Sequence, residues 1–65
     1  MNIYVHAWIT DKDLAIVSGL NEMNEPAIAG MTIEVFSNFK KQYGHLCMPF
    51  WAKIDKSKIT PISIN

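Results

Sequence analysis

Between residues 2 and 10, two kinds of side chain alternate along the chain. One set of alternate positions is apolar and comprises Ile3, Val5, Ala7 and Ile9, and the other comprises Tyr4, His6, Trp8 and Thr10. A period of two that is rich in β-branched and aromatic residues predicts a strand. Residues 11–13 are all charged and predict a short loop, after which residues 14–17 are expected to form the returning strand of a hairpin.

A helix is the alternative for residues 11–23. Ile16, Leu20 and Met23 fall at the helical positions i, i+4 and i+7. Gly19 argues against it, because glycine is unfavourable in a helix interior. We therefore favour the hairpin for this segment.

The clearest helical pattern covers residues 25–43. Asn24 is a suitable N-cap, and Pro26 lies in the first turn, where its missing N–H costs no hydrogen bond. Two lysines in the last turn complement the helix dipole, and Gly44 suits the left-handed position that follows many helices. One stripe of the helical wheel faces a single direction and consists of Ile28, Thr32, Val35, Phe36, Phe39 and Tyr43. We expect this stripe to be buried. Against a continuous helix, Gly30 and the β-branched pair at 32–33 also allow a strand over residues 31–36.

A second alternating pattern follows over residues 46–54. Polar residues 55–58 then lead into the largely apolar residues 59–64, so this region predicts a second hairpin. The expected core face of the sheet comprises Ile3, Val5, Ile9, Met48, Phe50 and Ile54. The predicted fold is therefore α+β: a small antiparallel sheet in the order ββαββ, with one long helix packed on one face.

The face of the sheet turned away from the helix is expected to be open and aromatic, because the pleat sends alternate side chains to opposite sides. Trp and Tyr bring large contact areas at a low cost in entropy and dominate interface hot spots. We predict that this face binds a partner through Tyr4, His6, Trp8, Trp51 and Lys53. The alternative is that either Trp wraps a sheet edge or belongs to the core.

A chain of 65 residues predicts a single domain over residues 1–65 with room for one core. Cys47 is its only cysteine, which excludes an intramolecular disulfide, and small secreted domains usually depend on such bridges. The N-terminus lacks the pattern of a signal peptide, and no apolar run is long enough to span a membrane. We therefore expect a cytoplasmic protein that does not insert into a membrane.

The net charge of the chain is zero, but acidic and basic residues are unevenly distributed along it. Residues 1–34 contain five acidic residues and one Lys, a sum of −4, and residues 35–65 contain five Lys and one Asp, a sum of +4. All six basic residues are Lys. Without Arg, the chain lacks the side chain best suited to bidentate recognition of phosphate and guanine, so nucleic-acid binding is disfavoured.

The residues that carry catalytic or metal chemistry are few. His6, His45 and Cys47 show neither a CxxC nor an HxxxH spacing, and no phosphate-binding or nucleophile motif occurs. A Cys/His nucleophilic pair would have no third residue to orient it. We expect neither an enzyme nor a bound metal or cofactor.

These observations favour a small non-enzymatic protein-interaction module that presents the aromatic residues of its sheet, or the polar face of its helix, to another protein. Accessory proteins of phages and other mobile elements have this character, and the expected role is to bind a host protein and inhibit or modulate it. A homodimer formed through the same open face fits as well. The alternative is a single-stranded nucleic-acid-binding protein in which Tyr4, Trp8 and Trp51 stack on bases while lysines contact phosphates.

Overall fold

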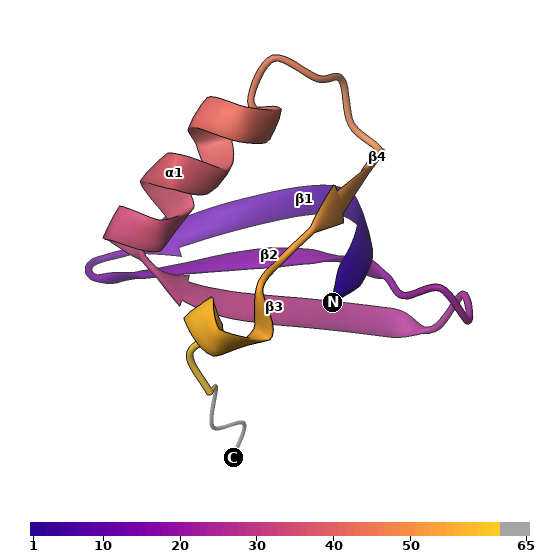
Figure 1. Ribbon diagram of the computed structural model, residues 1–65, viewed down its shortest axis with the longest axis horizontal. Helices are drawn as coiled ribbons and strands as arrows, with labels where there is room; N and C mark the ends of the chain where they lie inside the picture. Colours follow the sequence, from indigo (N-terminus) through magenta and orange to yellow (C-terminus); the bar gives the residue numbers. More distant parts are fainter. Residues whose placement is uncertain (62–65) are drawn as a thin grey trace.

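The computed structural model describes residues 1–61, which form a four-stranded antiparallel sheet with one helix packed on it (Figure 1). The elements in chain order are β1 (Asn2–Asp11), β2 (Leu14–Leu20), β3 (Pro26–Thr32), α1 (Ile33–Tyr43), β4 (Phe50–Lys53) and the short 3-10 helix η1 (Lys56–Lys58). The strands lie side by side in the order β3-β2-β1-β4. The predicted α+β class is confirmed, but the order of elements is βββαβ and not ββαββ.

Strands β1 and β2 form the predicted first hairpin. Their loop turns at Lys12, which has a φ of 51°, and β2 continues through Gly19 to Leu20. Because β2 pairs with β1 on one side and β3 on the other, its backbone groups are satisfied within the sheet. The helical alternative for this segment is therefore wrong.

Strand β3 occupies the first part of the segment predicted as a helix. The side chain of Asn21 accepts hydrogen bonds from the backbone N–H groups of Met23 at 2.8 Å and Glu25 at 3.0 Å, and Asn24 adopts a φ of 64°. Asparagine side chains stabilise turns in this way, so the chain reverses where we predicted a helix N-cap. The helix prediction is wrong for residues 25–32, since the alternating small and apolar residues there pair with β2.

Helix α1 confirms the second part of that prediction. Its N-cap is Thr32, whose hydroxyl accepts a hydrogen bond from the backbone N–H of Val35 at 3.2 Å. Phe36 and Phe39 are buried against the sheet. The helix ends at Tyr43 as expected, but the next residue, Gly44, has a φ of −64° and not the left-handed conformation we predicted.

The C-terminal part of the described chain does not form the predicted second hairpin. Strand β4 has four residues and is followed by η1, whose N-cap is Asp55. The backbone N–H and the hydroxyl of Ser57 both donate to the Asp55 carboxylate and hold its pKa below the usual value. The backbone N–H of Thr60 then donates to the carbonyl of Gly30 in β3 at 2.7 Å. The chain thus returns to the opposite edge of the sheet, and residues 62–64 of the predicted last strand lie outside the described residues.

The core lies between the sheet and helix α1. Its buried residues are Ile3, Val5, Ala15, Val17, Ala29, Met31, Phe36, Phe39, Phe50, Ala52 and Ile54. Two residues that we predicted for the core face, Ile9 and Met48, are 61% and 41% exposed. Met48 precedes β4 in a loop, and Ile9 follows a β-bulge between Val5 and Ala7 that shifts the alternation of β1 by one residue. No helix within residues 1–61 is long and apolar enough to cross a membrane.

Candidate functional site

The side of the sheet opposite helix α1 carries uncharged side chains between two charged ones, Asp11 in β1 and Lys53 in β4, and we call the uncharged set the outer face. It comprises Tyr4, His6, Ala7, Ile9, Ile16, Ser18, Leu20, Pro26, Ile28 and Trp51. One row of this face runs across all four strands, because Tyr4 pairs with both Trp51 and Leu20, and Leu20 pairs with Pro26. Inward-facing neighbours in the same strands, such as Val5 and Val17, are fully buried, so the two faces are clearly distinguished.

Trp8, which we predicted for the open face, lies on the other side of the sheet. Its ring makes edge contacts with Phe36, Phe39 and Phe50 at centroid distances of 5.7, 5.9 and 6.3 Å. The bulge that exposes Ile9 is the reason, since it turns Trp8 toward the helix. Trp8 is therefore a partly buried core residue, and its predicted place on the binding face is wrong.

The other four predicted residues lie together on β1 and β4. The Tyr4 ring stacks obliquely on Trp51 with centroids 5.1 Å apart and meets His6 edge to face at 5.2 Å. Trp51 is 51% exposed. Lys53 is also exposed and occupies a corner of the sheet, where it pairs with Asn2 at the start of β1. We call the three rings of Tyr4, His6 and Trp51 the aromatic half of the outer face.

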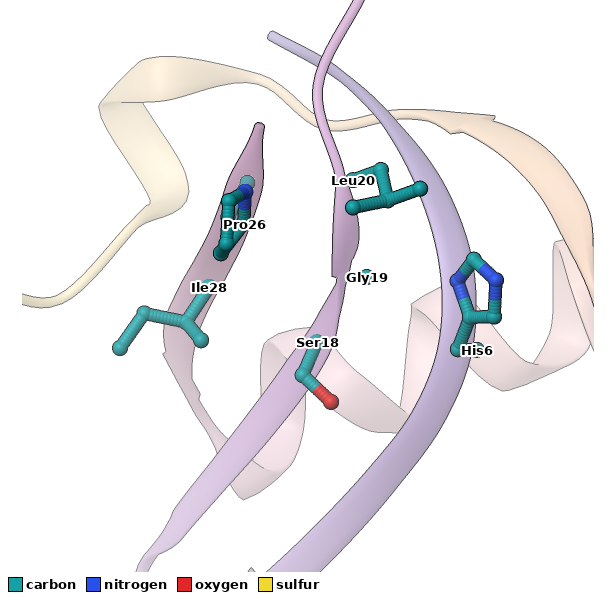
Figure 2. A pocket seen from close by; sticks show the side chains of 7 residues that line it. His6, Ser18, Gly19, Leu20, Pro26 and Ile28 are labelled. Carbon is teal, nitrogen blue, oxygen red and sulfur yellow. The ribbon is translucent and has the colours of Figure 1, made fainter. Parts of the chain in front are cut away.

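An open hollow of about 550 Å³ occupies the other half of the face. Its apolar walls are Leu20, Pro26 and Ile28 of β2 and β3, with Ser18 at its floor and His6 at its border with the aromatic half (Figure 2). We did not predict this hollow, because we expected residues 25–32 to form part of a helix. A strand could have been predicted here, because Pro26, Ile28 and Gly30 alternate with two alanines and a methionine.

Charge is confined to the margins of the outer face. By the alternation of the paired strands, Lys53 follows Trp51 and Asp11 follows Ile9 on the same side of the sheet, at opposite ends of the outer face. Lys53 stands at one corner, and Glu22 accepts a hydrogen bond from the Asn2 side chain at 2.6 Å at the same end of the sheet. A partner that covers the outer face between Asp11 and Lys53 removes no ion from water, which keeps the desolvation cost of binding low.

The outer edge of β4 is closed by a side chain. The hydroxyl of Tyr43 accepts a hydrogen bond from the backbone N–H of Lys53 at 3.0 Å and donates to its carbonyl at 3.4 Å. These are the groups with which a further strand would pair, and proteins often block such edges. The edge is therefore less available for docking than the outer face.

Replacing Tyr43 with Phe should open this edge. We expect Tyr43→Phe to lower the free energy of unfolding by about 0.5 to 1 kcal/mol, because the Lys53 backbone loses a partner that water can replace. Amide hydrogen exchange at Lys53 should accelerate. Tyr4→Phe is the matched control, since no hydrogen bond of the Tyr4 hydroxyl is found among the described residues. Equal protection of Lys53 in wild type and Tyr43→Phe would contradict this role.

The residues weighed as metal ligands or nucleophiles do not form a cluster. His45 and Cys47 lie in the exposed loop between α1 and β4, and His6 lies on the outer face. Within residues 1–61, no three His, Cys, Asp or Glu side chains come close enough to hold a metal ion together. The outer face is thus the feature on which a function can be argued.

Comparisons of the chain with models of known protein families, with curated proteins and with solved structures find no match.

Proposed function

We propose that this chain is a protein-interaction module and that the outer face is its docking surface. The observation that carries the proposal is the combination of large exposed side chains with an absence of charge across that face. Trp51, Ile28 and Ile9 are 51%, 45% and 61% exposed, while the opposite face of the same sheet is covered by helix α1. Burial of apolar surface stabilises a complex by roughly 25 cal/mol per Å², so a partner would be favoured here.

The dimensions of the face support this proposal. Four strands spaced at about 4.8 Å, with a mean length of seven residues at about 3.3 Å per residue, give a face of roughly 19 by 23 Å, on the order of 440 Å². Exposed apolar patches of a few hundred Å² mark interaction sites on soluble proteins. The aromatic half supplies the Trp and Tyr residues that dominate interface energetics.

The nucleic-acid alternative receives less support from the placement of its residues. Of the three rings expected to stack on bases, Trp8 is turned into the core. Of the described lysines, Lys53 alone shares the side of the sheet that carries Tyr4 and Trp51. Lys40 lies over the ring of Phe36 on the helix side, and the two lysines of η1 line hollows beside the last turns of the helix. Binding to nucleic acid depends on many cations acting together, which this face does not offer.

Site-specific photo-crosslinking tests the proposal. The full chain would be produced in the cells of its source with benzoylphenylalanine at position 28, in the wall of the hollow, and irradiated. We expect a discrete protein crosslink from this position, because the hollow would be covered by the partner. Position 37 is the matched control, since Ser37 is exposed on helix α1, away from the sheet.

A second substitution makes the test specific for the outer face. Trp51→Lys, introduced into the chain that carries the photoreactive residue, should abolish the crosslink, because it removes the largest exposed ring of the face. Crosslinking of equal strength at positions 28 and 37, or none at position 28, would refute the proposed function. A crosslink to oligonucleotide instead of protein would favour the nucleic-acid alternative.

A further inference from the structure

We infer that the protein seated on the outer face is a second copy of this chain, an inference that rests on the proposed function. The face has two unlike halves, one with exposed aromatic rings and one with an open hollow. The aromatic half on β1 and β4 presents the rings of Tyr4 and Trp51, and the other half on β2 and β3 presents the hollow walled by Leu20, Pro26 and Ile28. A surface with a projection on one side and a matching recess on the other is self-complementary under a two-fold rotation.

The strand order determines which rotation brings the two halves together. A two-fold axis that runs parallel to the strands, between β1 and β2, places the order β3-β2-β1-β4 against β4-β1-β2-β3 of the other copy. Trp51 and Pro26 lie in one cross-strand row, so this rotation sets each indole against the hollow of the opposite copy. An axis perpendicular to the strands would instead set ring against ring and hollow against hollow.

The distribution of charge also favours a second copy. A two-fold interface brings each surface group near its own symmetry mate, so a charged face repels itself. Within the four strands, the charged residues on this side of the sheet are Asp11 and Lys53, which lie at opposite ends of the outer face. Lys53 lies in β4 at one edge of the sheet, and the proposed axis carries the other Lys53 to the far edge, about three strand spacings of roughly 4.8 Å away. At that separation, which exceeds the Debye length of about 8 Å, the two ammonium groups interact little.

The area of the face predicts a weak dimer. Standard interfaces bury about 800 Å² on each partner, and the outer face offers on the order of 440 Å² before the corrugation of its side chains is counted. Interfaces below the standard size belong to weak and transient complexes, so we expect a dissociation constant in the micromolar range, on the order of 10 μM. The dimer should be visible by sedimentation velocity between about 1 and 500 μM, a range that brackets this constant.

Two charged variants test both the dimer and its orientation. Trp51→Lys and Ile28→Glu each place a charge in the interface, so each variant alone should sediment as a monomer up to about 500 μM, which is at least 50 times the expected wild-type constant. In an equimolar mixture, the new lysine of one chain faces the new glutamate of the other, while the second half of the interface retains its native Trp51 and Ile28. We therefore expect the mixture to form a heterodimer. Leu46→Lys is the control, because Leu46 is exposed like Ile28 but lies outside the sheet, and it should leave the dimer unchanged.

Other results would exclude either the proposed interface or the proposed orientation of the two copies. A wild-type chain that stays monomeric at about 500 μM, or variants that dimerise as well as wild type, would exclude the outer face as a homodimer interface. Single variants that are monomeric together with a mixture that is also monomeric would exclude the axis parallel to the strands. Circular dichroism of each variant shows whether it is folded, and both positions are about half exposed, so a loss of dimer is separable from a loss of fold.

The mass of the photo-crosslinked product separates failure of this inference from failure of the proposed function. A product at twice the chain mass from position 28 supports the second copy. A product of another mass, with a monomeric purified chain, would leave the interaction module in place and refute the homodimer. No product in cells and no dimer in solution would refute both.

Discussion

Trp8→Ala is expected to unfold much of the protein. The partly buried Trp8 ring joins β1 to helix α1 and β4 through Phe36, Phe39 and Phe50, so its removal takes away the common neighbour of these three rings. Truncation of a large aromatic residue in a core costs about 3 to 5 kcal/mol. A domain of this size has a total stability of roughly 3 to 10 kcal/mol, at about 0.05 to 0.15 kcal/mol per residue. Urea denaturation followed by circular dichroism would measure the loss.

Trp51→Ala is the matched control for this prediction. The indole of Trp51 is 51% exposed and contacts Tyr4 on the outer face, so its removal leaves no enclosed cavity. We expect a loss of about 1 kcal/mol or less in a monomeric sample, in keeping with the usual effect of substitutions outside the core. If the two alanine variants had equal stability, or if Trp51→Ala were the less stable, the assignment of Trp8 to the core and Trp51 to the outer face would be wrong.

The predictability of the first hairpin follows from its local pattern. Residues 2–10 alternate strictly, and the charged residues 11–13 mark the loop, so period and loop chemistry point to the same structure. The end of helix α1 at Tyr43 was predictable for a similar reason, because Phe36 and Phe39 share a helical stripe and Gly44 follows, although Gly44 does not adopt the left-handed conformation that we expected. In both segments the local preferences of the residues agree with the final fold.

The sequence of residues 25–32 is compatible with both a helix and a strand. Tertiary contacts determine that this segment forms a strand. Ile28 and Thr32 lie four residues apart, which places them on one face of a helix, yet Ala29 and Met31 alternate with Ile28 as in a strand. The strand is favoured because β2 otherwise has an unpaired edge with Val17 at its centre. The pairing of β2 with β3 cannot be predicted from the periodicity of the sequence, because it depends on the turn at Asn21 that brings the two strands together.

The candidate site was predictable only in its aromatic half. Tyr4 and Trp51 come together because β1 pairs with β4, and both were expected on the open face from their alternation with buried neighbours. The position of Trp8 was not predictable, because a β-bulge inserts one residue without a distinctive sequence signature. The hollow depended on recognising β3, so its walls at Leu20 and Pro26 were missed with that strand.

Gly19→Ala tests the structural basis of the bulge that turns Trp8 inward. A Cβ atom at position 19 would lie 1.8 Å from the carbonyl oxygen of Tyr4 and 3.1 Å from the backbone nitrogen of His6. Both are backbone atoms of the bulged strand, so no side-chain rotation relieves the overlap. We expect a loss of about 3 kcal/mol or more in the free energy of unfolding, because backbone has to move in two paired strands. Thermal and urea denaturation would measure it.

Ser18→Ala controls for the effect of a small substitution in the same strand. Ser18 donates a 3.3 Å hydrogen bond to the carbonyl of Ala7 near the surface, so its loss should cost about 0.5 to 1 kcal/mol. In any Gly19→Ala chain that remains folded, the shortest way to admit the methyl group is to straighten the bulge, which would rotate Trp8 away from Phe36 and toward solvent. The fluorescence and near-ultraviolet circular dichroism of that indole should then change together with stability. A Gly19→Ala protein as stable as Ser18→Ala, with an unaltered Trp8 signal, would show that the close approach of the two strands does not determine which way the indole faces.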